Sequence, residues 1–346
     1  MGCRVINQVY QLVAPRQIEV TYNNEDIKSD QVVVRPLYLS ICAADQRYYT
    51  GSRNQSVLHK KLPMSLIHEG VGEVVYDQQG EFAVGTKVLL VPNTPTEVDY
   101  TISENYLASS KFRSSGFDGF MQDYVFMDHD RLVELDDSIK DLSTIAYSEL
   151  VSVSWHAIQR FKQKSISNRK SFGIWGDGNL GYITAMLLHK LYPDAKIYAF
   201  GKTDFKLSHF SFVDAVYHIH DIPEGVTFDH AFECVGGKGS QAAINQMIDL
   251  ISPEGSISLL GVSEYGVEIN TRMVLEKGLT LFGSSRSGAQ DFKDVAQLYK
   301  DNPDIVEKLS LLKGEEYEVK TINDAIQAFE ADLSTSWGKT VIKWTM

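Results

Sequence analysis

The chain has 346 residues, and its 45 acidic against 33 basic side chains give a formal net charge of −12 at pH 7. Such a charge repels nucleic acid and anionic membranes, so neither is an expected partner. Hydrophobic residues make up 43% of the chain, enough for two cores, and no apolar run is long enough to cross a membrane, so we expect no membrane insertion. The three cysteines, Cys3, Cys42 and Cys234, are too few for a disulfide framework and indicate a reducing, cytoplasmic compartment.

Short β segments separated by turns fill the first 150 residues. They are rich in Val, Leu and aromatic residues, as in Gln31–Leu37, Gly72–Tyr76, Lys87–Val91 and Met121–Met127. Between them, Asn93–Gly119 is polar and irregular and is expected to form a surface lobe. This pattern predicts a β-rich first domain.

From Ser148 to about Gly288 strands alternate with helices. The expected strands are Ser171–Gly176, Lys196–Phe200, Phe228–Cys234 and Ser256–Gly261, and the expected helices are Gly181–Tyr192, Asp204–Phe212 and Gly239–Ile251. Alternation at this spacing predicts an α/β fold with a doubly wound parallel sheet. The tail adds a helix over Asp291–Lys300 and a strand over Gly338–Trp344.

A G-x-G-x-x-G motif follows the first of these strands and begins a helix. Its glycines are Gly176, Gly178 and Gly181, with Asn179 and Leu180 between the last two. The first glycine permits a tight turn, the second lets the backbone approach a pyrophosphate, and the third allows close packing of helix on strand. The motif and its flanking elements predict a dinucleotide site, whereas the glycines alone would fit any glycine-rich loop.

The second strand of this unit indicates which nicotinamide cofactor binds. Enzymes that use NAD place Asp or Glu at its end to hold the ribose hydroxyls. Here the corresponding residues are Gly201, Lys202 and Thr203, which offer space, a cation and a hydroxyl in place of a carboxylate. This composition favours NADP(H), and Lys206, one helical turn further on, is a second cation for the 2′-phosphate. The alternative is that Lys202 is only a solvated surface lysine.

Four side chains in three separate segments can bind a metal. They are Cys42, His68, Glu69 and Glu149, which together offer a thiolate, an imidazole and two carboxylates. Three protein ligands with an open position are typical of catalytic zinc, and four closed ligands of structural zinc. Taken singly, each residue is more often a buried cysteine, a hydrogen-bonded histidine or a solvated carboxylate.

The combination of Cys42, His68-Glu69-Gly-x-Gly, the late Glu149 and the glycine motif resembles the zinc-dependent medium-chain dehydrogenase/reductase family over nearly the whole chain. The resemblance implies a GroES-like catalytic domain over 1–148, a Rossmann domain over 149–288, and a segment 289–346 that returns to the catalytic domain. It also implies that Cys42, His68, Glu69 and Glu149 are the zinc set, and that Asp45 orients His68.

Two departures from the family pattern affect the expected site. The lobe Asn93–Gly119 has no cysteine, where many members carry four for a structural zinc, so one zinc per chain is expected. Ala44 stands where many alcohol dehydrogenases have the Ser or Thr that starts a proton relay. The expected proton donors are therefore a zinc-bound water, or Glu69 or Glu149 acting through water.

Within the family, Glu149–Ala157 looks like the sorbitol-dehydrogenase branch. Ser40–Arg53, Ser65–Gly72, Ser114–Asp123 and Gly173–Gly181 resemble, more closely, the ribulose-5-phosphate reductases that supply ribitol 5-phosphate for teichoic acid synthesis. That resemblance implies a reductase that uses NADPH, zinc as a Lewis acid on the ketone, a homodimer, and association with a ribitol-5-phosphate cytidylyltransferase.

A phosphorylated sugar substrate needs a local cationic site in so acidic a protein. The candidates are Arg47 and Arg53, just after the zinc cysteine, and Arg286, after the last Rossmann strand, although each is equally often a surface arginine. Two alternatives remain: an NAD-linked polyol dehydrogenase of the sorbitol type, and an NADP-binding regulator with a degenerate site.

Overall fold

The computed structural model describes residues 4–346, so Cys3 lies outside the described residues. The chain forms two compact units: unit 1 contains the chain up to Ser152 and from Ser287 onward, and unit 2 is Val153–Arg286. These boundaries lie close to the expected ones at 148/149 and 288/289. No helix in the described part of the chain combines the length and apolar character needed to span a membrane.

Unit 1 is built around a seven-stranded sheet in which strands distant in sequence are neighbours. Its order is β10-β6-β5-β3-β18-β17, and β9 also pairs with β3. The strands are β3 (Gln31–Ser40), β5 (Glu69–Asp77), β6 (Lys87–Leu90), β9 (Val125–Asp128), β10 (Leu132–Glu134), β17 (Lys313–Val319) and β18 (Lys339–Trp344).

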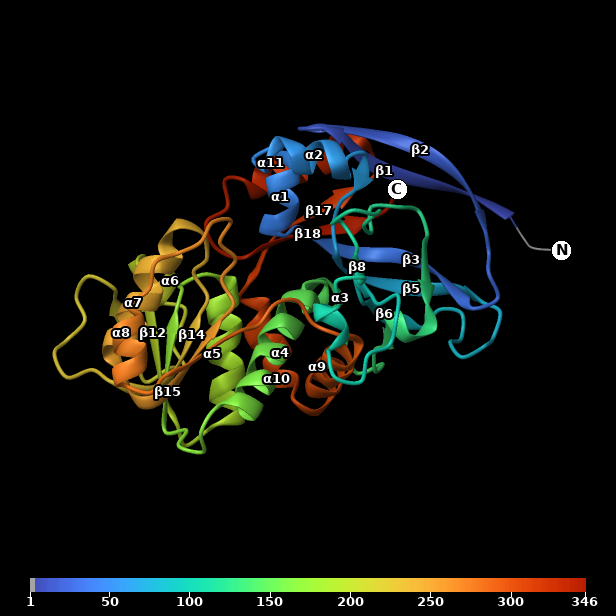
Figure 1. Cartoon of the computed structure of the whole chain (residues 1–346). Coiled ribbons are helices and arrows are strands. Elements are labelled where there is room, and N and C mark those ends of the chain that lie inside the picture. The colour runs from blue at the N-terminus through green and yellow to red at the C-terminus, as the bar shows by residue number, and fades with distance from the viewer. Residues whose placement is uncertain (1–3) are drawn as a thin grey trace. The chain divides into compact units, whose positions relative to one another are not determined.

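The last strand, β18, lies inside this sheet, between β3 and β17 (Figure 1). It pairs antiparallel with β3, with Val341 opposite Ser40, and parallel with β17. Trp344 at its end contacts Tyr10 edge-to-face at 5.3 Å and donates its indole N–H to the Gln122 carbonyl at 2.9 Å. The end of the chain therefore completes the core of unit 1.

Two smaller sheets complete the described part of unit 1. A long hairpin, visible at the N-terminal end in Figure 1, pairs β1 (Arg4–Ala14) with β2 (Gln17–Asp26), and β4 (Met64–Ser65) joins β1. In the lobe expected over 93–119, β7 (Asn93–Thr94) pairs with β8 (Lys111–Phe112), with a 3₁₀ turn between them.

An ion pair holds the lobe to the rest of unit 1. The buried guanidinium of Arg131 donates to both carboxylate oxygens of Glu104, at 2.8 and 3.2 Å, and to the Asn93 carbonyl at 3.0 Å. Glu104 also accepts the backbone N–H of Ala289 at 2.8 Å. This cluster joins the lobe to Arg131 and to the first residue of the helix that begins at Ala289.

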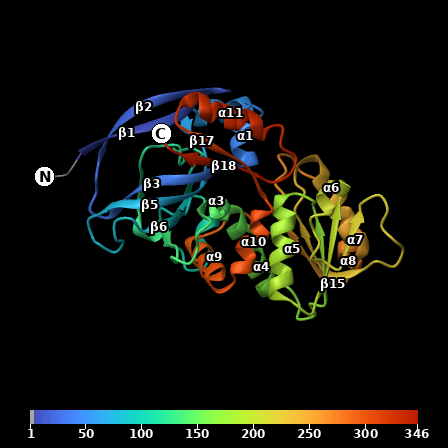
Figure 2. The ribbon, with the colours of Figure 1, turned by 180° about the vertical axis from the view of Figure 1, so that it is seen from behind.

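Helices cover both ends of the unit 1 sheet. They are α1 (Ala43–Tyr49), α2 (Gln55–Lys61), α3 (Leu142–Ile145), α9 (Ala289–Asp301), α10 (Pro303–Ser310) and α11 (Ile322–Asp332). In both views α1 lies beside α11, and the ring of Tyr49 stacks on Phe329 at 4.7 Å (Figure 1, Figure 2). The boundary between the units falls within α4 (Ser148–Lys164).

Unit 2 contains the parallel sheet that the sequence predicts. Its order is β13-β12-β11-β14-β15-β16, and every pairing is parallel. The strands are β11 (Ser171–Trp175), β12 (Lys196–Gly201), β13 (Ala215–His218), β14 (Phe228–Glu233), β15 (Ile251–Leu259) and β16 (Thr280–Gly283).

The helices of unit 2 are α5 (Asn179–Leu191), α6 (Asp204–Leu207), α7 (Ser240–Leu250) and α8 (Thr271–Glu276). In both views the strands lie between α5 on one side and α7 and α8 on the other (Figure 1, Figure 2). Trp175 and Phe200, fully buried at the ends of β11 and β12, stack at 3.7 Å and belong to the core on the α7 side. The predicted doubly wound architecture is confirmed.

Two predicted elements are wrong in extent. The helix expected over Asp204–Phe212 ends at Leu207, because tight turns follow and bring Phe210 into the core against Tyr182. The strand expected from Met121 begins only at Val125, because the backbone N–H of Met121 bonds to Leu66 and is not free to join the sheet.

Candidate functional site

Three of the four predicted metal ligands meet in unit 1. Cys42 precedes α1, His68 precedes β5 and Glu69 begins β5, and their ligand atoms lie within 4.8 Å of one another. His68 and Glu69 are buried and Cys42 is half-buried. No other group of three or more Cys, His, Asp or Glu residues between 4 and 346 is as close. The structure therefore brings together a thiol, an imidazole and a carboxylate at one point.

The buried Asp45 connects the segments that carry these ligands. Its carboxylate accepts the backbone N–H of Cys42 and of Ile67, both at 3.1 Å, and the Ser114 hydroxyl at 2.6 Å. Its Oδ1 also faces Nδ1 of His68 at 3.5 Å. Asp45 thus places a carboxylate beside Nδ1 of His68, an arrangement in which Nε2 would remain for a metal.

The charges of Asp45 and His68 are mutually stabilising. Burial alone would raise the pKa of Asp45, but the charge of His68 and the hydrogen bonds hold that pKa below its ordinary value. Burial alone would lower the pKa of His68, but the charge of Asp45 and the contact with Cys42 hold it well above its ordinary value. A metal that binds here must therefore displace a proton from the imidazole.

Ile67 has a strained backbone directly before His68. Its φ is +68°, in the left-handed region that a β-branched residue rarely adopts. Both of its backbone polar groups are held, the N–H by Asp45 and the carbonyl by the N–H of Phe120 at 2.7 Å. Such strain persists only where the surroundings impose it, and here it sets the direction of the His68 side chain.

Lys339, at the start of β18, is a site residue that the sequence reasoning missed. Its ammonium group donates to Glu69 Oε1 at 3.0 Å and to the Ile41 carbonyl at 2.8 Å, and lies 2.8 Å from Glu69 Oε2. Burial alone would lower its pKa, but the charges of Glu69 and Cys42 raise it above its ordinary value. A metal and Lys339 therefore compete for the same carboxylate.

Glu149, in the first turn of α4, lies outside the group of three ligands. Burial raises its pKa to about 7; the charges of His68 and Lys339 oppose this increase, and that of Glu69 adds to it. The carboxyl group is thus close enough for the charges of His68, Glu69 and Lys339 to shift its pKa. Its assignment as a fourth ligand stays a prediction.

The donor atoms fit zinc. Thiolate sulfur, imidazole nitrogen and carboxylate oxygen are the ligands that zinc takes in proteins, and three protein ligands leave one tetrahedral position for a substrate. Asp45 supplies the outer hydrogen-bonding partner that zinc-binding histidines require. Cys42, His68 and Glu69 therefore suit a catalytic zinc.

Two of the three candidate phosphate-binding arginines lie in and just after α1. The guanidinium of Arg53 stacks on the buried ring of Tyr48, 4.4 Å from its centroid. Nε of Arg47, Nε of Arg53 and the Tyr48 hydroxyl are buried, and none has a hydrogen-bond partner among residues 4–346. Arg286 belongs to unit 2, where it has a φ of +58°.

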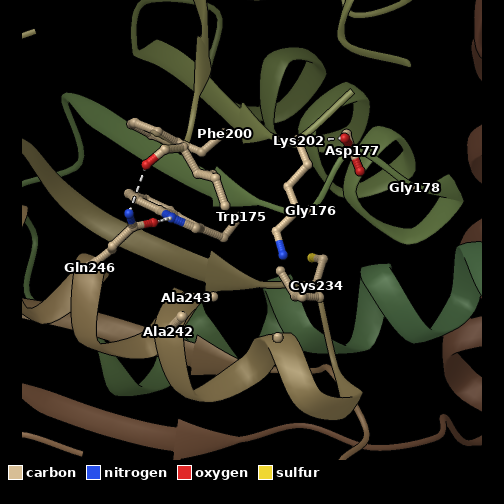
Figure 3. A pocket seen from close by; sticks show the side chains of 14 residues that line it. Trp175, Gly176, Asp177, Gly178, Phe200, Lys202, Cys234, Ala242, Ala243 and Gln246 are labelled. Atoms are coloured by element: carbon tan, nitrogen blue, oxygen red, sulfur yellow. Dashed lines mark hydrogen bonds between the residues drawn. The ribbon is translucent and has the colours of Figure 1, made fainter. Parts of the chain in front are cut away.

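Unit 2 has a pocket at the carboxyl ends of its strands. Of the eight predicted cofactor-binding residues, Gly176, Gly178, Gly201 and Lys202 line it. The other four, which are not among its lining residues, are Asn179, Leu180, Gly181 and Thr203. The Lys202 amino group points into the pocket on the side of Cys234 (Figure 3). Lys202 is the only cation among the lining residues.

The three motif glycines have the local geometry that a dinucleotide loop needs. Gly176 has a φ of +126°, and an added Cβ would lie 2.8 Å from the Cys234 carbonyl oxygen. Gly178 precedes α5 and faces open space, which leaves room for a ligand. A Cβ on Gly181 would lie 1.9 Å from the Gly176 carbonyl oxygen, so only glycine permits this packing.

As expected, β12 itself ends without an acidic residue, but a carboxylate from another segment lies at the end of this strand. Asp177, from the glycine loop, lies against Gly201. Its Oδ2 accepts the backbone N–H groups of Lys202 and Thr203, each at 2.8 Å, and Figure 3 shows Asp177 beside Lys202. Asp177 was not among the predicted site residues, because a ribose-binding carboxylate is expected at the end of the second strand and not in the glycine loop. The glycine at position 201 was the available signal, since it creates the space that Asp177 fills.

Relatives of known activity match the chain over nearly its whole length. It is 75% identical to ribulose-5-phosphate reductase 1 of Staphylococcus aureus, covering 99% of this chain and all of that protein. It is 59% identical to the ribulose-5-phosphate reductase of Bacillus spizizenii, covering 98% and 99%. The crystal structure of S. aureus TarJ in complex with NADPH matches with a TM-score of 0.89 and 69% identity, covering 99% and 100% of the two chains.

Two family descriptions match this chain. Residues 28–137 match the alcohol dehydrogenase GroES-like domain, which contains Cys42, His68 and Glu69. Residues 197–301 match the zinc-binding dehydrogenase domain. With the parallel sheet and the full-length relatives, these matches establish that the chain belongs to the zinc-binding medium-chain dehydrogenase/reductase family.

Proposed function

We propose that this protein reduces D-ribulose 5-phosphate to D-ribitol 5-phosphate with NADPH, and so supplies the synthesis of poly(ribitol phosphate) wall teichoic acid. The observation that carries the proposal is the buried group of Cys42, His68 and Glu69, in a chain 75% identical to a ribulose-5-phosphate reductase. The chain differs from that relative at about a quarter of the 342 aligned residues.

Cys42, His68 and Glu69 hold one zinc, and the glycine loop with Lys202 and Thr203 holds NADP(H). Bound zinc polarises the ketone, and the nicotinamide supplies the hydride. Asp45 keeps His68 in a fixed tautomer, and Ile67 fixes the direction of its side chain.

The proton that the product alcohol needs comes from a zinc-bound water, or from Glu69 or Glu149 acting through water, and the pKa of Glu149 supports the last of these. Ala44 has no proton to give, whereas burial raises the pKa of Glu149 to about 7 in the protein alone. A general acid is most effective when its pKa lies near the working pH.

Arg47 and Arg53 bind the substrate phosphate. Stacking on Tyr48 orients the planar group of Arg53, and the two arginines stand six residues apart in and just after α1. A planar guanidinium suits the bidentate geometry of a phosphate. We keep Arg286 as a third candidate.

The protein acts in the cytoplasm as a homodimer, and its product passes to a ribitol-5-phosphate cytidylyltransferase that associates with it. Free thiols at Cys42 and Cys234 support a reducing compartment. The exposed side of edge strand β16 and the exposed Val262 and Leu275 nearby in sequence support pairing through unit 2.

The test is a substrate panel of D-ribulose 5-phosphate and free D-ribulose, each with NADPH and NADH, followed by nicotinamide absorbance. The proposal expects the pair of sugar phosphate and NADPH to be used best by at least about tenfold. Equal use of free ribulose would refute the phosphate site. The Asp177 carboxylate near the expected ribose position favours one rival, an NAD-linked polyol dehydrogenase, which the same panel would reveal by preferred use of NADH.

A further inference from the structure

The segment Gly201–Thr203 at the end of β12 has its backbone polar groups fixed from two sides. The N–H groups of Lys202 and Thr203 both donate to Asp177 Oδ2 at 2.8 Å. The Lys202 carbonyl lies 2.8 Å from Nε2 of His218, and the Gly201 carbonyl accepts the N–H of Ile219 at 2.9 Å. These contacts leave the segment little freedom to change shape.

Two successive backbone N–H groups in a turn are a common binding site for an anion. Here the Asp177 carboxylate already occupies them, so a ligand phosphate cannot use them without displacing a carboxylate. A phosphate at the end of β12 must therefore be recognised by side chains, and Lys202 is the only cation among the residues that line the pocket. The position of the Lys202 and Thr203 side chains therefore depends on what fixes their backbone.

Gly201 and Asp177 are sterically matched. A Cβ at position 201 would lie 2.6 Å from the Asp177 Cβ and 2.8 Å from its Oδ2, closer than atoms can approach. The absence of a side chain at Gly201 thus makes room for Asp177 rather than directly for a ligand. His218 reaches the same segment from the neighbouring strand, since it lies opposite Gly201 in the pairing of β12 with β13.

We propose that Asp177 and His218 are positioning residues that set the preference for a 2′-phosphorylated adenosine by holding Lys202 and Thr203 in place. The inference rests on the proposed use of NADPH and goes beyond it, because neither residue needs to touch the phosphate. Asp177 acts as a hydrogen-bond acceptor, and its negative charge, next to an anionic ligand, is tolerated because two N–H groups neutralise part of it.

The test measures binding of adenosine 2′,5′-bisphosphate and of 5′-AMP to the full-length protein by isothermal titration calorimetry. The two probes differ only in the 2′-phosphate, so the ratio of their Kd values isolates its recognition without any turnover. The variants are Asp177→Asn, Asp177→Ala, His218→Gln and His218→Ala. Asn keeps an acceptor at the position of Asp177 Oδ2, and Gln keeps a nitrogen donor near that of His218 Nε2.

The wild-type protein is expected to prefer the bisphosphate by at least about tenfold. Asp177→Ala and His218→Ala are expected to reduce this preference to less than about threefold by weakening the bisphosphate alone, and Asp177→Asn and His218→Gln to retain it. Lys202→Met should lose the preference directly. Asp214→Ala is the matched control, because Asp214 accepts the Ile197 N–H at 2.8 Å at the opposite end of β12 and should leave the preference unchanged.

An unchanged preference in Asp177→Ala would overturn the inference, as would a stronger one, which would mean that the carboxylate acts only by repulsion. Loss of 5′-AMP binding in Asp177→Asn would also overturn it and would identify Asp177 as a ribose acceptor. If the wild type itself does not distinguish the two probes, the proposed use of NADPH fails together with the inference. A preference that persists in every variant except Lys202→Met rejects the inference and keeps the proposed function.

Discussion

Lys339→Met tests whether Lys339 neutralises the charge of Glu69 when no metal is bound. Lys339 and Glu69 form an ion pair with side chains 5% and 0% exposed. Removing one partner of a buried pair leaves an uncompensated charge and costs about 3–5 kcal/mol. We therefore expect the free energy of unfolding of the chelator-treated protein to fall by about that amount. Urea denaturation of the full-length protein measures it.

Zinc should reverse much of this loss. In the variant the carboxylate of Glu69 has no cation except the metal, so the free energy released on zinc binding includes the relief of its unpaired charge. Zinc should consequently bind Lys339→Met at least about tenfold more tightly than wild type, a difference of about 1.4 kcal/mol. Competition against a chromophoric chelator measures this affinity directly.

Two controls separate the pair from general effects. Lys339→Arg keeps the cation and should remain close to wild type in metal-free stability. Lys87→Met breaks the ion pair of Lys87 with Glu73, also on β5 but with side chains 34% and 30% exposed, and should cost no more than about 1 kcal/mol. If Lys339→Met is no less stable than Lys87→Met, or binds zinc more weakly than wild type, competition between Lys339 and the metal is refuted.

Four other predictions concern the metal, the cofactor and the substrate. Elemental analysis should find one zinc per chain, and Cys42→Ala should remove both zinc and turnover while circular dichroism shows an intact fold; two zincs per chain would contradict this. Zinc binding at pH 7 should release a proton from His68, whose pKa is raised, and calorimetry in buffers of different ionisation enthalpy should find less proton release for Asp45→Asn. The kcat/KM with NADPH should exceed that with NADH by at least about tenfold, and Lys202→Glu should reduce or invert the ratio. Arg53→Ala should raise the KM for the sugar phosphate by about tenfold or more, the effect of losing a charge-assisted contact of about 1.5–3 kcal/mol, and an equal fall in kcat would contradict simple ground-state binding.

The sequence predicts the interior of the fold better than its edges. Strand β11, with the sequence SFGIW, is buried at all but its first residue and appears as an apolar run. The edge strand β17, with the sequence KGEEYEV, is largely exposed and has no hydrophobic pattern to detect. It joins the sheet because β18 provides a backbone partner, which no local property of the sequence specifies.

The site shows a similar division between local and distant information. Cys42, His68 and Glu69 stand in recognisable motifs, so their identity is available from the sequence. Lys339 lies 270 residues from Glu69 and occupies an ordinary position in a terminal strand, so only the completed sheet brings the two together. Asp177 lies inside a recognised motif but acts on a different strand, and its partner is a backbone segment that has no sequence signature.

The position of β18 in the sheet also determines at what stage of synthesis unit 1 can finish folding. Unit 2 is one continuous stretch, so it has all its strands once Arg286 has left the ribosome. Unit 1 is still incomplete at that stage. One edge of β3 lacks its partner strand, which contains Val341, and the core lacks Trp344. The N-terminal half of the unit therefore stays open, with an exposed strand edge, while the inserted unit folds.

The residues of the metal site are also synthesised at different times. Lys339, the cation that neutralises Glu69 when no zinc is bound, is synthesised 270 residues after Glu69. A nascent chain that carries Cys42, His68 and Glu69 without β18 has an unpaired carboxylate, so metal ions are its available counter-charge. Zinc captured at this stage would draw together the segments around Cys42 and β5 before the end of the chain arrives to complete the sheet.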